Sequence, residues 1–214
     1  MPINQFANEI DEDIIWRIDE ISIIKMNVIA IPNRGKRKDV AYRYSLPAIY
    51  SVWEGFIFKT MTEYIRKLND MQIPIKDANL DLVMNCAYDK FDLNNARNAI
   101  DKRRVLVKSI YDFMVNGVLT MPFKVPTNSN VDFECLTKIH SKYNLDLPDE
   151  SKFQACLDKH VNLRNKVSHG DNSIRIDQTH IDAFANCVID LMYDIKEIVI
   201  KNIANASYNI NPIS

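Results

Sequence analysis

Hydrophobic residues recur along this chain at helical spacing, which predicts a succession of α-helices. In residues 6–31 they follow one another at steps of three and four, as Phe6, Ile10, Ile14, Ile18, Ile21 and Ile24. A second, longer helix is expected from about 40 to 69, with Pro47 either near its start or kinking it. Its broad apolar face consists of Ile49, Val52, Trp53, Phe56, Ile57, Thr60, Met61, Tyr64 and Leu68, and Glu54 lies among them.

The same spacing predicts five further helices. We expect them near residues 78–89, 94–116, 131–143, 150–168 and 177–206. No segment alternates strictly over enough residues to demand a sheet. The predicted fold class is therefore all-α, an up-and-down helical bundle of about five to seven helices.

The chain length suits one domain. The 214 residues are enough for one substantial domain and a little short for two. We therefore expect a single helical domain over residues 1–214, with a core at about 40–206 and an N-terminal helix at 6–31.

Composition narrows the possible functions. Hydrophobic residues make up 47% and charged residues 26%, an ordinary globular mixture that can bury a core. Only four glycines occur, and neither the dinucleotide-binding glycine motif nor a P-loop motif is present, so the usual nucleotide cradles are excluded. The formal charge of −1 gives no global attraction for nucleic acid, so any RNA contact must come from local basic patches.

The cysteines and the N-terminus favour an intracellular protein. Cys86, Cys135, Cys156 and Cys187 are scattered and contain no C-x-x-C pair, which favours reduced thiols over a disulfide framework. Acidic residues occupy positions 9, 11, 12 and 13, where a secretory leader would be apolar. No apolar run reaches the ~18 residues of a membrane span. We expect a cytoplasmic protein that does not enter the membrane.

One cluster carries candidate chemistry, the run Arg164-Asn165-Lys166-Val167-Ser168-His169. Gly170 stands where a helix C′ residue belongs, so His169 should lie at the C-terminal end of the 150–168 helix. At about 100° per residue, Asn165 and His169 lie roughly 40° apart around the axis, whereas Arg164 lies roughly 140° from His169. The long guanidinium must therefore curl toward the histidine.

This run resembles the R-x4–6-H motif of HEPN domains, a superfamily of helical bundles with many ribonucleases. Two further segments are similar to one bacterial branch, the RiboL-PSP-HEPN group. They are the run from Tyr50 to Phe56, which contains Trp53-Glu54-Gly55, and the run Asn-Val-Asp-Phe-Glu-Cys-Leu at 130–136. The resemblance touches scattered points from about 42 to 205.

The resemblance implies a metal-independent endoribonuclease without a cofactor, in which the RNA 2′-OH attacks the adjacent phosphorus and leaves a 2′,3′-cyclic phosphate. His169 would transfer protons and Arg164 would stabilise the charge on the phosphorane. Asn165 would orient the histidine or a phosphate oxygen. Glu54 is expected either as a partner of these residues or as a buried carboxylate that anchors packing.

The resemblance also implies partners. HEPN ribonucleases generally pair two such motifs across a homodimer, and a toxin-like or phage-defence role would bring a cognate antitoxin or a defence-system partner. Lys166 and Ser168 beside the motif are candidate RNA contacts. Arg103 and Arg104, in a basic cluster with Lys102 and Lys108, are further candidates, although such a cluster is often a solvated helix face.

Other interpretations stay open. Arg164 fits a surface ion pair and His169 a helix cap, in which case the chain would be a catalytically silent module for dimerisation or partner binding. A nucleotide-binding regulatory domain is a weaker alternative. The pairs Cys135-x4-His140 and Cys156-x3-His160 have ligand types that suit zinc, but buried cysteines and solvent-facing histidines explain the same residues.

Overall fold

The computed structural model describes residues 3–32, 35–88, 90–91 and 100–210. Within these ranges the chain forms seven α-helices and no strand, so the predicted all-α class is confirmed. The helices are α1 (Ile3–Ile29), α2 (Lys36–Asp70), α3 (Leu80–Tyr88), α4 (Ile100–Asn116), α5 (Phe133–Lys142), α6 (Glu150–Ser168) and α7 (Gln178–Ala204), with a 3-10 turn η1 at Ile75–Asp77.

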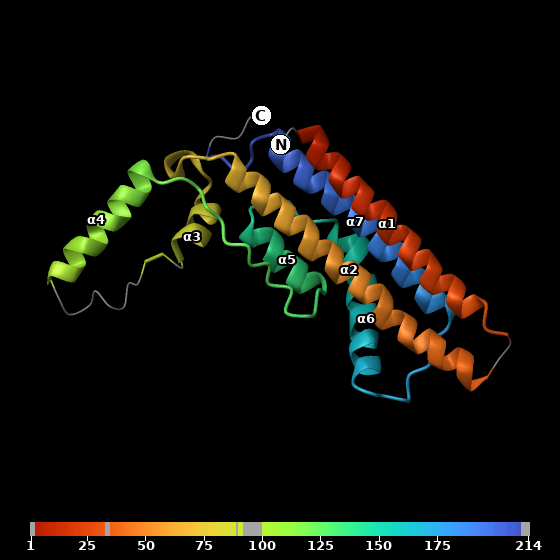
Figure 1. Ribbon diagram of the computed structural model, residues 1–214. Helices are drawn as coiled ribbons and strands as arrows, with labels where there is room; N and C mark the ends of the chain where they lie inside the picture. Colours follow the sequence, from red (N-terminus) through yellow and green to blue (C-terminus); the bar gives the residue numbers. More distant parts are fainter. Residues whose placement is uncertain (1–2, 33–34, 89, 92–99, 211–214) are drawn as a thin grey trace.

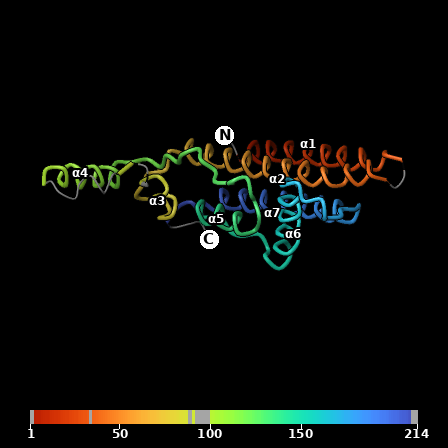
Figure 2. Tube along the Cα trace, turned by 90° about the horizontal axis from the view of Figure 1, so that it is seen from below, coloured from red at the N-terminus to blue at the C-terminus, as the bar shows by residue number. Residues whose placement is uncertain are grey.

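The three longest helices form the body of the molecule. α1, α2 and α7 pack against one another along their lengths, and α6 crosses both α2 and α7 (Figure 1). Seen from below, α5 and α6 lie on the side of the bundle away from α1 (Figure 2). α4 extends away from this body, and its main contact is with η1 (Figure 1). No helix in the described ranges is long and apolar enough to cross a membrane.

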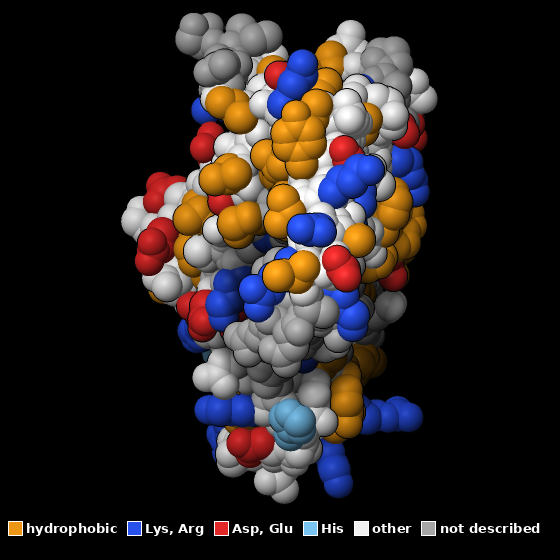
Figure 3. All heavy atoms as spheres, turned by 90° about the vertical axis from the view of Figure 1, so that its left-hand side faces the viewer, with side chains coloured by type: hydrophobic (Ala, Val, Ile, Leu, Met, Phe, Trp, Pro, Cys, Tyr) orange, Lys and Arg blue, Asp and Glu red, His pale blue; other side chains and the backbone are white. Residues whose placement is uncertain are grey.

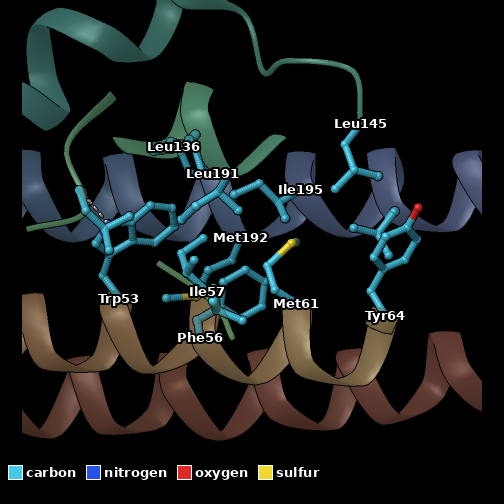
Figure 4. Packing of buried hydrophobic residues seen from close by; sticks show 14 of the residues in the cluster. Trp53, Phe56, Ile57, Met61, Tyr64, Leu136, Leu145, Leu191, Met192 and Ile195 are labelled. Atoms are coloured by element: carbon cyan, nitrogen blue, oxygen red, sulfur yellow. Dashed lines mark hydrogen bonds between the residues drawn. The ribbon is translucent and has the colours of Figure 1, made fainter. Parts of the chain in front are cut away.

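The core lies where the apolar face of α2 meets α5 and α7. Side chains of α2 spaced at three and four residues point into it, and they interlock with side chains of the other two helices (Figure 4). The labelled members are Trp53, Phe56, Ile57, Met61 and Tyr64 of α2, Leu136 of α5, Leu145 after α5, and Leu191, Met192 and Ile195 of α7. The indole nitrogen that enters this core has a partner: the Trp53 Nε1 donates to the Val131 carbonyl oxygen at 2.9 Å.

α1 is joined to α2 by a buried charged group as well as by its isoleucines. Arg17 donates to the Asp13 carboxylate at 2.6 Å and to the Val52 carbonyl oxygen of α2 at 2.7 Å. Its guanidinium lies against Gly55, where an added Cβ would sit 3.0 Å from the Arg17 Nη1. The glycine of the Glu54-Gly55 pair therefore leaves room for this buried arginine.

Pro47 lies in the interior of α2 because the helix begins at Lys36, before the expected residue 40. A proline has no backbone N–H, so the carbonyl of Arg43, four residues earlier, lacks its usual helical donor. Helix α2 nevertheless continues through this point to Asp70. The turn that contains Pro47 lies in the half of α2 that faces the C-terminal end of α6.

Candidate active site

The C-terminal end of α6 has the geometry that Gly170 predicts. Gly170 has a φ of 81°, and its N–H donates to the Val167 carbonyl oxygen at 3.0 Å. The next N–H, of Asp171, donates to the Lys166 carbonyl oxygen at 3.0 Å. These two bonds form a Schellman motif, which ends the helix cleanly. His169 is the C-cap residue and its side chain is exposed, as expected.

Arg164 is held in place by α2 and by the loop before α5. Its guanidinium carbon lies 3.3 Å from the centre of the Tyr50 ring, a close cation–π contact. Its Nη2 donates to the Ser129 carbonyl oxygen at 2.9 Å. Among the described residues no carboxylate pairs with it, so the surface ion pair is not what the structure contains. The planar Arg164 guanidinium is therefore fixed in orientation, and some of its N–H groups remain available to hydrogen-bond a ligand.

Arg43 of α2 joins this region, and the sequence prediction missed it. Its Nη2 donates to the Asp171 carbonyl oxygen at 2.7 Å, two residues after His169. Arg43 and Tyr50 are seven residues apart, about two helical turns, and so lie on one face of α2. That face runs along the end of α6, with Tyr50 under Arg164 and Arg43 under the turn after His169. The seven-residue spacing between Arg43 and Tyr50 was the sequence feature that could have indicated that both lie on one face of α2.

The Asn165 side chain connects α6 to the start of α5. Its Nδ2 donates to the Asn130 Oδ1 at 2.8 Å, and the Asn130 Nδ2 donates to the Asp132 carboxylate at 2.7 Å. Asp132 is the N-cap of α5, where it accepts from the Cys135 N–H at 2.9 Å. Asn165 thus anchors the helix that carries Arg164. Its expected role as a group that orients the histidine or a phosphate oxygen stays a prediction.

Glu54 lies one turn after Tyr50 on α2 and is half-buried. It forms no hydrogen bond or ion pair with the described residues, so it is not a satisfied buried anchor. Burial raises the pKa of Tyr50 to about 12, the Val131 N–H and Arg164 oppose that shift, and Glu54 adds to it. The carboxylate is therefore within electrostatic reach of the ring that carries Arg164. Its role as a partner of the motif residues stays a prediction.

Comparison of the sequence with models of known protein families identifies the family of this chain. Residues 6–208 match the model of the MAE_28990-like HEPN family. The chain belongs to the HEPN family. Neither the curated proteins nor the solved structures contain a match to it. The HEPN membership predicted from Arg164 and His169 is confirmed, and the match covers α1 as well as the expected core.

The remaining predicted RNA contacts of this HEPN chain divide into two groups. Lys166 and Ser168 are exposed on the last turn of α6, beside His169. Arg103 and Arg104 are exposed on α4, which Figure 1 places at the far end of the molecule from α6. Figure 3 faces that end and shows Lys and Arg side chains interspersed with hydrophobic ones. One chain therefore does not bring Arg103 and Arg104 to the motif.

The histidines of the zinc alternative are not solvent-facing, so that expectation is wrong. His140 is 0% and His160 is 2% exposed. Each ring has its Nδ1 on a backbone carbonyl oxygen, His140 with Asp146 at 2.5 Å and His160 with Cys156 at 2.7 Å, so one nitrogen of each buried ring is hydrogen-bonded. Within the described part of the chain, no three side chains of metal-binding type are grouped.

A pair of Tyr50 variants tests whether the ring positions Arg164. Tyr50→Phe keeps the ring but removes the hydroxyl that accepts from the Val131 N–H at 2.8 Å, so unfolding in urea should show a loss of about 1–2 kcal/mol with cleavage nearly unchanged. Tyr50→Leu also removes the surface under Arg164, and single-turnover RNA cleavage should fall on the order of 10-fold or more. Equal cleavage by the two folded variants would show that the contact has no positioning role.

Proposed function

We propose that this HEPN chain is a metal-independent endoribonuclease that cleaves RNA by attack of the 2′-OH on the adjacent phosphorus. The products are a 2′,3′-cyclic phosphate and a 5′-OH. The observation that carries the proposal is the exposed His169 at the end of α6, on the same helix as an Arg164 that is oriented with no carboxylate partner among the described residues.

His169 supplies proton transfer in this proposal. Imidazole is the side chain whose ordinary titration range suits proton exchange near neutral pH. Its exposed position at the helix end lets an RNA strand approach it without movement of the core. Because a protonated imidazole can pass its proton to a leaving oxygen, we assign His169 to protonation of the leaving 5′ oxygen.

Arg164 supplies the fixed positive charge. The phosphorane carries more negative charge than the ground-state diester, and a planar guanidinium stabilises it without losing its own proton. The contacts with Tyr50 and Ser129 hold the fork before substrate arrives, so little reorganisation accompanies the reaction. Arg43, which holds the turn after His169, adds a second positive charge near that end of α6.

We propose that the active form is a homodimer. In-line attack needs a base at the 2′-OH and an acid on the opposite, leaving side, and one chain supplies a single exposed histidine at the end of α6. Two copies related by a twofold axis near α6 would bring two histidines and two arginines into one cleft. A toxin-like or phage-defence role, in the cytoplasm and under control of a cognate antitoxin or defence-system partner, is the biological context that HEPN membership supports.

The chemical test uses purified protein in EDTA with matched substrates. An RNA oligonucleotide should be cleaved, and the same oligonucleotide with one 2′-deoxy position should lose cleavage at that linkage because the attacking hydroxyl is missing. Mass spectrometry should identify the cyclic phosphate. Activity that requires an added divalent metal, or cleavage of all-DNA substrate, would contradict this mechanism. A folded dimer inert on every RNA would favour the silent binding module instead.

A further inference from the structure

Two cysteines, Cys156 of α6 and Cys187 of α7, lie in the region where these helices pack, which the proposed ribonuclease site does not use. The Cys156 Sγ of α6 lies 3.7 Å from the Ala183 carbonyl oxygen of α7. Cys187 is one turn after Ala183 and so continues the same face of α7. Cys156 is partly exposed, whereas Cys187 is buried at 8% exposure. An accessible thiol thus sits beside a protected one.

The surroundings of Cys156 favour its thiolate. The His160 Nδ1 lies 3.5 Å from the Cys156 Sγ. The pKa of Cys156 is lowered to about 5 by the interaction with the Cys187 thiol, then by His160, with a smaller contribution from Lys159. The pKa of Cys187 is raised by Cys156 and by burial, with Asp190 and Lys152 as the remaining charged neighbours.

The two other cysteines have the opposite character. Burial raises the pKa of Cys86, which is half-buried. Burial also raises the pKa of Cys135 to about 11, and the nearby Asp132 carboxylate adds to that shift. Because the thiolate is the reactive form, Cys156 is set apart from the other three thiols near neutral pH.

We propose that Cys156 is a peroxide-reactive site and that Cys187 is its resolving partner, so that oxidation joins α6 to α7 by a reversible disulfide. The Cys156 thiolate attacks one oxygen of hydrogen peroxide, the O–O bond breaks, and Cys156 becomes a sulfenic acid with release of hydroxide. The Cys187 sulfur then displaces the sulfenic oxygen as the S–S bond forms, and the Cys187 proton leaves with that oxygen as water. In sum, two thiols and one peroxide give one disulfide and two waters.

The disulfide would tie the helix that carries the motif to the core. Cys156 lies eight residues, about two turns, before Arg164 on α6. The turn of residues 169–177 already connects α6 to α7 at the other end, so the bond would add a second link between the same helices. A thiol reductant would restore the two free cysteines.

The first experiment measures the chemistry on the reduced full chain. One equivalent of hydrogen peroxide should remove two of the four titratable thiols and lower the intact mass by about 2 Da, the loss of two hydrogens. Peptide mapping should find Cys156 linked to Cys187, and dithiothreitol should reverse the change. A product with oxygen added at Cys156 and no link, or first oxidation at Cys86, would overturn the proposal.

Variants separate the two roles. Cys187→Ala should leave Cys156 as a sulfenic acid that dimedone traps, formed more slowly because the Cys187 thiol is the largest cause of the lowered Cys156 pKa. Cys156→Ala should prevent oxidation of Cys187. Cys86→Ser is the matched control, since Cys86 is also half-buried, and it should behave as wild type. If a variant unfolds at a much lower temperature than wild type, alkylation of the wild-type chain tests the reactivity of the thiols instead. Iodoacetamide should label Cys156 down to about pH 5 and Cys86 only at alkaline pH. Labelling of both only at alkaline pH would overturn the proposal. None of these readouts depends on RNA cleavage.

Discussion

Replacement of His169 by alanine is expected to lower the rate of RNA cleavage by about 10²-fold or more, because general acid–base catalysis contributes on that order. The side chain is exposed at the end of α6 and contributes no buried contact. The free energy of unfolding should therefore change by less than about 1 kcal/mol. Single-turnover cleavage of a labelled RNA, measured beside a thermal melt of the same sample, checks both parts.

The control is a second histidine that is accessible but lies on another element. His180, in the first turn of α7, pairs with the Asp177 cap at 2.7 Å, and His180→Ala should leave cleavage close to wild type. If His169→Ala keeps full activity, the ribonuclease proposal fails at its centre. If the His169→Ala variant unfolds at a temperature many degrees lower than wild type, His169 is a structural cap. The catalytically silent module then becomes the better interpretation.

Replacement of Arg164 by alanine is expected to lower cleavage by a similar factor, on the order of 10²-fold, because the phosphorane loses its fixed cation. Arg164→Lys keeps the charge but loses the planar fork that stacks on Tyr50 and reaches Ser129, so it should recover only part of the rate. Full activity of the lysine variant would mean that charge alone is sufficient. Full activity of the alanine variant would remove Arg164 from the mechanism.

A mixing experiment with the His169→Ala variant tests the shared cleft. A dimer of one wild-type chain and one His169→Ala chain holds a single histidine, so its cleft lacks either the base or the acid. Once subunits have exchanged with an excess of the variant, cleavage per wild-type chain should therefore fall well below that of the wild-type dimer. Mixed dimers, demonstrated by mass spectrometry, that keep full cleavage per wild-type chain would show that each chain acts by itself.

The local sequence pattern was sufficient to predict features that depend only on residues close together in the chain. The 150–168 helix was predicted with its observed bounds because Asp149 supplies a side-chain cap at the start and Gly170 supplies the positive φ at the end. The same glycine placed His169 at the exposed terminus. The long apolar stripes of α2 and α7 likewise predicted which faces are buried, since periodic hydrophobicity leaves a helix one way to face the core.

Bounds were less accurate where several residue types are compatible with a helix. α2 begins at Lys36 rather than near residue 40, and Pro47 is therefore in its interior. The basic residues at 36–38 are compatible with a helix as well as with a loop, so their type did not locate the start of the helix. The first helix and the last helix differ from prediction by a few residues at their ends. The part of the predicted 94–116 helix before residue 100 lies outside the described residues.

The sequence by itself determined the fold class and the placement of the motif at a helix end, because both follow from spacing within short segments. The family came from the resemblance of the motif segments to HEPN domains. Only the tertiary structure decided what surrounds that motif. Tyr50 meets α6 and Arg43 meets the turn after it from more than 100 residues away in the chain, and Asn165 of α6 meets Asn130 in the loop before α5. Such contacts depend on the angle at which α6 crosses α2, which is set by packing of the whole core and has no local signature.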